Sequence, residues 1–311
     1  MTLPDTPGGL RMRIRATVAV TVAAALAVSA GGCAGPPGAR APGPGRAGPS
    51  AGAAAATSGA SSPATSRGPA RVSRPSSAAA RLCGPPDAPG RLVTMRAVDG
   101  VRLAAIETVA GDRGVALVPE HGPAGKCGWW PFAAYLAARG FRVLLFDHRC
   151  TGQSGCVPGT AGTDLMPDIR TAVARLRHDG AARVALAGAS QGGSEALIAS
   201  TDPALDVTGV VALSADQLTL PLASPPYPAT ALTAAPRLRR PALFAVAASD
   251  PYVSVRETRT LVARAGSPSK HLVVVGAGAG HGWDLVTPAR PGGAPARLSR
   301  AVLAFLREVT S

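Results

Sequence analysis

From about residue 91 onward, short apolar runs rich in β-branched residues alternate with amphipathic helical patterns, and few folds accommodate such an alternation. Two β-rich runs, at 91–98 and 101–109, flank Asp99 and Gly100, a pair that predicts the turn of an opening hairpin. Six more apolar strand-like runs follow, at 115–119, 142–146, 184–187, 207–213, 242–247 and 272–275. Helical patterns separate or follow them, at 131–139, 167–178, 191–200, 255–265 and 297–309. We therefore expect an α/β fold with a mostly parallel eight-stranded sheet and helices on both faces.

The first 80 residues have a different composition and are not expected to join this fold. Arg11, Arg13 and Arg15 precede an uncharged apolar run at 16–30, which is typical of a signal peptide over residues 1–32. Of the 50 residues from 31 to 80, 43 are Ala, Gly, Pro, Ser or Thr, so residues 33–80 are predicted to be a disordered tether. The predicted folded domain covers residues 81–311.

The junction after the apolar run carries a Cys preceded by small residues. Ala30, Gly31, Gly32 and Cys33 resemble a bacterial lipobox, and the resemblance implies that Cys33 is acylated. The protein would then be exported and anchored to the cell membrane by lipid, with its domain facing outward. Ala30 departs from the larger aliphatic residue usual at that place, so ordinary signal-peptide cleavage, which would give a secreted protein, stays open.

The strongly basic charge does not by itself predict a nucleic-acid partner. The formal net charge is +14, and residues 1–80 hold eight Arg and one acid, which is half of that excess. No basic run is interleaved with aromatic residues, as single-strand binding would require. We expect no nucleic acid among the partners, and the oligomeric state is not predicted.

A GxSxG pattern marks the point where chemistry is expected. Gly188 and Gly192 flank Ser190 between the predicted strand at 184–187 and the predicted helix at 191–200, the context of a nucleophile elbow. A serine hydroxyl needs an imidazole to accept its proton and a carboxylate to orient that imidazole.

Two residues in later loops fit those two roles. His281 lies between glycines six residues past the last strand, and Asp250 follows the strand at 242–247, where open sheets place their active residues. Asp216, after the preceding strand, is an alternative acid. No GxGxxG opens a helix and no metal-binding constellation appears, so we expect no cofactor and no metal.

These motifs together resemble the α/β-hydrolase superfamily over about residues 91–309. The order Ser190, Asp250, His281 is the family's order, and the Asp-His-Arg-Cys-Thr-Gly-Gln-Ser run at 147–154 follows the fourth strand. His121-Gly122, with one Cys and two Trp downstream, is similar to exported bacterial esterase-like and dienelactone-hydrolase-like members. The resemblance implies a serine hydrolase that cleaves carboxylic esters of small to medium acyl groups through an acyl-enzyme. An amidase or peptidase with the same triad, and a non-catalytic envelope lipoprotein that uses the fold as a binding platform, stay open.

The oxyanion loop departs from the family pattern. The residue after His121-Gly122 is Pro123, which has no N–H to donate to the developing oxyanion. We expect Gly122 or Ala124 to supply the second donor beside the Gln191 N–H. The segment at 214–241 is short and contains six Pro, so little or no cap domain is expected.

Apart from Cys33 the chain has four Cys, at positions 83, 127, 150 and 156. An even number in an exported protein predicts two disulfides, with three alternative pairings. In the fold that the sequence resembles, the loops after the third and fourth strands are neighbours, which implies a bridge from Cys127 to Cys150 or Cys156. We further expect packing, rather than binding, from Trp129, Trp130 and Phe132, framework roles from His121, and surface or strand-end positions for His148, His178 and His271.

Overall fold

The computed structural model describes residues 77–108, 111–157, 164–216, 224, 226–288 and 296–311. The predicted signal peptide, Cys33 and most of the predicted tether lie outside the described residues. The first helix, α1 (Ala78–Cys83), begins inside the range predicted as tether, because the Ser77 hydroxyl caps it by accepting the Ala80 N–H at 3.0 Å. None of the described helices is long and apolar enough to cross a membrane.

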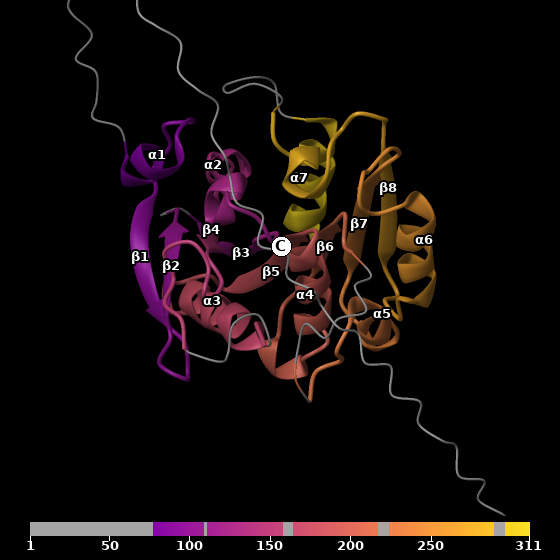
Figure 1. The fold of residues 1–311 in the computed structure, drawn as a ribbon, viewed down its shortest axis with the longest axis horizontal. Coiled ribbons are helices and arrows are strands. Elements are labelled where there is room, and N and C mark those ends of the chain that lie inside the picture. Colours follow the sequence, from indigo (N-terminus) through magenta and orange to yellow (C-terminus); the bar gives the residue numbers. More distant parts are fainter. Residues whose placement is uncertain (1–76, 109–110, 158–163, 217–223, 225, 289–295) are drawn as a thin grey trace, which may run out of the picture. The chain divides into compact units, whose positions relative to one another are not determined.

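Eight strands form one sheet in the order β1-β2-β4-β3-β5-β6-β7-β8 (Figure 1). Their bounds are β1 (Arg91–Arg96), β2 (Arg102–Glu107), β3 (Arg113–Val118), β4 (Phe141–Phe146), β5 (Arg183–Ala189), β6 (Val210–Leu213), β7 (Ala242–Ala247) and β8 (Lys270–Val275). The β1–β2 hairpin is antiparallel and β2 pairs antiparallel with β4, whereas β4, β3, β5, β6, β7 and β8 run parallel. The predicted eight-stranded, mostly parallel sheet is confirmed.

Helices cover both faces of the sheet, as predicted (Figure 1). The helices after α1 are α2 (Trp130–Ala137), α3 (Met166–His178), α4 (Gln191–Ala199), α5 (Ala231–Ala234), α6 (Val255–Arg264) and α7 (Arg297–Val309). Strand side chains alternate between faces: Val115 and Leu117 of β3 pack with α1, α2 and α7, and Ala116 and Val118 pack on the side of α3 to α6. The expected packing role is confirmed for the aromatic residues at the start of α2, since each is at most 1% exposed: Trp129, Trp130 and Phe132.

Local signals in the sequence set the helix ends. Pro131 and Pro167 occupy the first turns of α2 and α3, where a missing N–H costs nothing. The turns that follow these helices use Gly140 (φ 86°) and Gly180 (φ 98°), in the left-handed region that favours glycine. Between β6 and β7 the described residues form only α5 and a 3₁₀ turn, η3 (Ala235–Arg237), while residues 217–223 and 225 lie outside the described part.

Two disulfides are present, in a pairing that differs from the one implied by the family resemblance. Cys127 is bridged to Cys83, with Cα atoms 5.0 Å apart, and Cys150 to Cys156, with Cα atoms 4.3 Å apart. The two-disulfide prediction and a bridge at Cys127 are confirmed, but the partner predicted for Cys127 is wrong.

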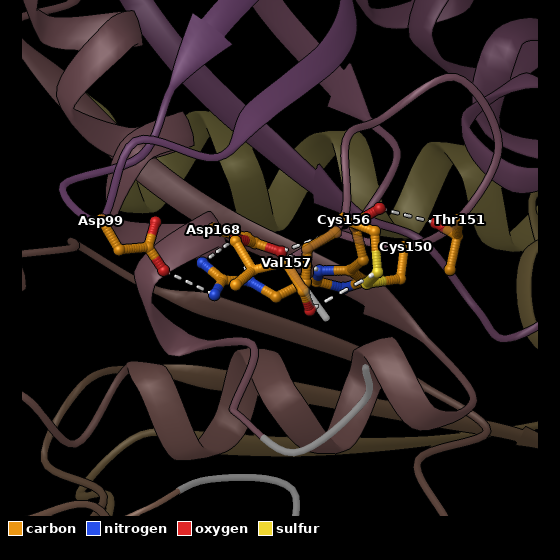
Figure 2. The surroundings of a disulfide bond; sticks show 8 residues. Asp99, Cys150, Thr151, Cys156, Val157 and Asp168 are labelled. Carbon is orange, nitrogen blue, oxygen red and sulfur yellow. Dashed lines mark hydrogen bonds and ion pairs between the residues drawn. A yellow bond between two sulfur atoms is a disulfide. The ribbon is translucent and has the colours of Figure 1, made fainter. Parts of the chain in front are cut away.

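The reason for the difference is local. Helix α1 packs against η1 (Gly125–Trp129), the 3₁₀ turn that carries Cys127. The loop after β4 closes on itself, because Cys150 has a positive φ of 61° and its N–H donates to the Gly155 carbonyl at 2.9 Å. Figure 2 shows this second bridge beside Asp99 and Asp168.

Candidate active site

The nucleophile candidate lies in a sharp turn between β5 and α4. Ser190 has φ 53° and ψ −125°, a conformation that residues other than glycine rarely adopt. Its N–H donates to the Leu213 carbonyl of β6 at 2.8 Å, and its own carbonyl accepts the Gly193 N–H at 2.9 Å. This is the strand, turn and helix that the GxSxG pattern predicts.

The two flanking glycines are required by the close approach of backbone. A Cβ on Gly188 would overlap the carbonyl of Gly192, and a Cβ on Gly192 would overlap the carbonyl of Pro119. Neither position therefore accepts a side chain without moving a strand end. The spacing of glycines around Ser190 has a steric cause in this chain.

The structure brings His281 and Asp250 together across two loops. His281 Nδ1 lies 2.9 Å from Asp250 Oδ1 and 3.0 Å from Oδ2. Asp250 follows β7, and His281 follows β8 between Gly280 (φ 87°) and Gly282 (φ 55°), whose positive φ values turn the loop. Among the residues that the structure describes, no hydrogen bond joins the alternative acid, Asp216, to His281, and the Asp216 carboxylate accepts from the Ser194 hydroxyl at 3.1 Å.

Asp250 is held as an ionised, oriented carboxylate. Its Oδ1 accepts the backbone N–H groups of Tyr252 and Val253, both at 3.0 Å, and its Oδ2 accepts the Ser214 hydroxyl at 2.6 Å. Burial raises the pKa of Asp250, but these hydrogen bonds and the one from His281 outweigh burial and hold the pKa below its usual value. An ionised Asp250 keeps the proton of the neutral imidazole on Nδ1 and leaves Nε2 free to accept one.

Ser214 is a residue of the candidate site that the sequence analysis missed. It ends β6 at φ 47°, and its hydroxyl both donates to Asp250 and accepts the Gly282 N–H at 3.1 Å. One side chain therefore links the acid loop to the histidine loop. The only signal in the sequence is a polar residue directly after an apolar strand.

The histidine loop also reaches the elbow. A Cβ placed on Gly282, next to His281, would lie 3.3 Å from the Ala189 Cβ, next to Ser190. Ser190, Asp250 and His281 thus all lie at the carboxyl edge of the parallel strands. Within the described residues the Ser190 hydroxyl makes no hydrogen bond, so its link to His281 stays a prediction.

A buried ion pair holds the loop in which the second oxyanion donor is expected. The Lys126 ammonium lies 2.5 Å from Asp147 Oδ2, and the Lys126 N–H donates to Asp147 Oδ1 at 2.8 Å. Both side chains are buried, and Gln153 donates its backbone N–H to the same carboxylate at 3.0 Å. Asp147 therefore fastens the loop after β3 to the loop after β4. The sequence analysis placed Asp147 only in the motif.

The structure gives the positions of the oxyanion donors predicted from the sequence, and their role as donors stays a prediction. Gly122 and Ala124 lie exposed in the loop after β3, and Gln191 begins α4. Among the residues that the structure describes, no protein acceptor takes up the backbone N–H of any of the three. Pro123 lies between the first two, so the loop offers N–H groups on either side of it.

His148 lies two residues past the end of β4, as one of the two expected positions, but it is buried, so the alternative of a surface position is wrong. Its Nε2 lies 2.8 Å from the Glu195 carboxylate of α4 and its Nδ1 3.5 Å from Asp168 of α3. Burial lowers the pKa of His148, but the two carboxylates outweigh burial and raise it to about 9. The charged imidazole thus ties the loop after β4 to α4. The three other histidines outside the predicted triad are exposed: His121, His178 and His271.

Comparison with known proteins finds a family model that matches part of the chain, curated relatives and several solved structures of similar fold. Residues 115–229 match the model of a family described as serine aminopeptidase, S33. The uncharacterized protein YfhR of Escherichia coli K12 is 32% identical over 126 residues, and that of Salmonella typhimurium is 33% identical over 128 residues. These matches cover 38% of this chain in each case, and the chain spans 44% and 43% of the two relatives, less than half of their length.

Solved structures extend the likeness over most of the domain. The esterase PF2001 of Pyrococcus furiosus has a TM-score of 0.58 at 19% identity, covering 71% of this chain and 91% of that one. A thermophilic esterase from Thermogutta terrifontis has a TM-score of 0.56 at 18% identity, covering 71% and 100%. Est1E of Butyrivibrio proteoclasticus, solved with ferulic acid, has a TM-score of 0.55 at 15% identity, covering 70% and 98%. At these identities the likeness shows the fold.

Proposed function

We propose that this chain, which has the α/β-hydrolase fold, is a serine hydrolase that cleaves carboxylic esters of small to medium acyl groups. The observation that carries the proposal is the arrangement at the carboxyl edge of the sheet. A strained elbow presents Ser190, and His281, which is hydrogen-bonded to Asp250, lies in the loop that approaches this elbow. The described residues contain no cluster arranged to hold a metal ion.

The proposed reaction has two halves. In the first, Ser190 Oγ attacks the ester carbonyl while its proton moves to His281 Nε2, and the proton then passes to the departing alcohol. In the second, His281 Nε2 takes a proton from water while the water oxygen attacks the acyl-enzyme carbonyl, and the imidazolium then returns that proton to Ser190 Oγ as the acid leaves. Asp250 keeps the ring oriented throughout and stabilises the imidazolium.

The oxyanion is proposed to be held by backbone donors. The Gln191 N–H at the start of α4 is one, and Gly122 or Ala124 supplies the other. Removing one such donor costs about 10² to 10³ in rate in other enzymes. The ties at Asp147 and Cys127 support this assignment, because they hold the loop that carries the second donor.

The substrate class is proposed from the neighbours and from the short segment over the site. The proteins of similar fold include two named as esterases. The segment between β6 and β7 is 28 residues long and contains six Pro, which leaves little chain for a lid over the pocket. We expect activity on short to medium 4-nitrophenyl esters.

The localisation of the protein is a further part of the proposal. Two disulfides support export to an oxidising compartment. We expect Cys33 to carry the lipid that anchors the protein to the cell membrane. Cys33→Ser should release the protein or stall its processing, and mass spectrometry of the mature N-terminus tests this. An unmodified mature N-terminus at another residue would refute it.

Labelling with a fluorophosphonate probe tests the nucleophile directly. The wild-type chain should react at Ser190, with the adduct located by peptide mass spectrometry, and Ser190→Ala should not react. Loss of the nucleophile should lower ester turnover by roughly 10⁶, as in other serine enzymes. Ser311→Ala, at the exposed end of the chain, is the matched control and should label and turn over as wild type. A Ser190→Ala protein with more than a tenth of wild-type turnover would refute the assignment of Ser190 as the nucleophile.

A peptidase with the same triad is the second candidate, because the matched family is described as serine aminopeptidase. Aminoacyl 4-nitroanilides tested beside 4-nitrophenyl esters separate the two activities. A protein that hydrolyses neither and does not label would instead be a binding platform, the reading that Pro123 favours.

A further inference from the structure

Glu120 is a carboxyl group at the site for which the proposed mechanism has no role. It lies two residues past the end of β3, just before His121 and Gly122. Its Oε2 atom is buried and has no hydrogen-bond partner in the part of the chain that the structure describes. A buried carboxylate oxygen without a hydrogen bond is costly, so the position of Oε2 calls for a physical account.

The Glu120 carboxyl packs directly against the histidine loop. A Cβ built on Gly282 would overlap Glu120 Oε2, so the carboxyl occupies the place where a side chain at 282 would begin. Gly282 has a φ of 55°, and its N–H is held by Ser214. The loop that carries His281 is therefore fixed between the Ser214 hydroxyl and the Glu120 carboxyl.

The groups around Glu120 set its charge. The carboxylates of Asp250, in the loop after β7, and of Asp284, in η4 (Gly282–Leu285), face it, and the Trp283 backbone N–H opposes them. Burial, with the two carboxylates, raises the pKa of Glu120 to about 7. The carboxyl is therefore neutral at acid pH, where its unpartnered oxygen costs least, and anionic above neutrality. His281, next to Gly282 in the same loop, gains positive charge in the proposed reaction.

We propose that Glu120 is a positioning residue for His281: its carboxylate, set against Gly282 in the loop that carries His281, adds a further negative charge beside this loop and makes His281 a stronger base. The inference rests on the proposed function, since base strength matters only if His281 takes a proton from Ser190. An anion near the ring favours the imidazolium that forms in the transition state. Asp250 orients the ring through hydrogen bonds, whereas Glu120 acts through charge.

The decisive measurement is the pKa of the His281 ring by NMR titration, in the wild-type chain and in Glu120→Gln. The resonance is assigned by its loss in His281→Gln. In the wild type we expect two inflections, one of them near pH 7 from Glu120. In Glu120→Gln we expect a single inflection and a ring pKa lower by about one unit. A single wild-type inflection, or an unchanged ring pKa in the variant, would overturn the inference.

The pH profile of kcat/KM gives the matching kinetic readout. In Glu120→Gln the acid limb should move to lower pH by the same amount, with kcat on the plateau reduced several-fold and KM unchanged. Glu308→Gln, which removes an exposed carboxylate from α7, is the control and should leave the profile in place. A change in KM alone would overturn the inference in favour of a packing role.

The two readouts separate failure of this inference from failure of the proposed function. The NMR titration needs no turnover, so it decides the role of Glu120 even if no ester is cleaved. If Glu120→Gln does not fold, the two wild-type inflections remain the test. Turnover that depends on Ser190 while the ring titrates once would leave the serine hydrolase standing and remove Glu120 from it.

Discussion

Replacing Ser214 by Ala should lower both activity and stability, although Ser214 is not one of the three proposed triad residues. The change removes a hydrogen bond of 2.6 Å to the Asp250 carboxylate, a kind that contributes about 1.5–3 kcal/mol. It also leaves the buried Gly282 N–H without its acceptor at 3.1 Å, which costs about 1–3 kcal/mol. Both bonds belong to one hydroxyl, so their costs do not add in full, and we expect the free energy of unfolding to fall by roughly 2–4 kcal/mol.

The catalytic effect follows from the same two bonds. Without the Ser214 hydroxyl, Asp250 loses the donor that fixes Oδ2, and the loop of His281 loses one of its two supports. If half of the stability loss appears in the transition state, kcat falls about 5- to 30-fold, because about 1.4 kcal/mol corresponds to tenfold in rate. KM should change little, since Ser214 is fully buried.

A second substitution at the same position separates the hydroxyl from the backbone. Ser214 has a φ of 47°, so Ser214→Gly relieves about 1 kcal/mol of strain or more while it also removes the hydroxyl. The Gly variant should be more stable than the Ala variant and equally impaired in kcat. Ser200→Ala is the control, because Ser200 is a buried serine whose hydroxyl donates to the Leu197 carbonyl at 2.8 Å. It should lose stability and keep its kcat.

The assay is the steady-state hydrolysis of a 4-nitrophenyl ester, with urea unfolding of each variant at the same pH. Two results would refute the reasoning about Ser214. One is retention of more than half of the wild-type kcat by either variant. The other is a difference in kcat between Ala and Gly that follows their difference in stability.

Three further predictions concern the acid, the thiols and Glu120. Asp250→Asn should lower kcat far more than Asp216→Asn, and the reverse ranking would move the acid to the loop after β6. Replacing Cys83 and Cys127 by Ser removes a bridge that spans 44 residues and should lower the free energy of unfolding in urea by about 4 kcal/mol. Replacing Cys150 and Cys156, whose bridge spans 6 residues, should lower it by about 2 kcal/mol, and equal losses would contradict this. The pKa of Glu120 rises from 4.5 to about 7 on folding, so its stabilising contribution is full below pH 4.5 and is lost as the pH rises through 7. Glu120→Gln should therefore have a higher free energy of unfolding than wild type at pH 8.5, by an amount on the order of 2–3 kcal/mol after a discount for solvent screening. The two proteins should not differ at pH 4.5, and calorimetry at both pH values can check this.

The parts of the fold that follow from local pattern were predictable. The alternation of strands and helices, the stops at Gly140 and Gly180 and the turn around Ser190 each depend on residues close together in the chain. The pairing of His281 with Asp250 was predictable too, because both follow parallel strands whose carboxyl ends share one edge of the sheet. Their roles in catalysis stay predictions.

The features that sequence analysis missed depend on contacts between distant loops. Ser214 acquires its role only because the loops that carry Asp250 and Gly282 close on it. His148 lies in a polar run that is typical of a surface loop, and its burial depends on Glu195, which arrives 47 residues later on α4. Cys127 finds Cys83 because α1 packs against η1, an arrangement that the resemblance to a family did not include.

The bridge between Cys83 and Cys127 also determines how the chain responds to mechanical force. A pull applied N-terminal to Cys83 passes through the covalent sulfur bond to Cys127, so residues 84–126, which include β1, β2 and β3, are not extended. At roughly 3.4 Å per extended residue, the 44-residue separation removes about 150 Å from the contour length of the stretched chain. Reducing agents should restore that length in a force–extension trace, and the hairpin and Glu120 then become part of the segment that bears the load.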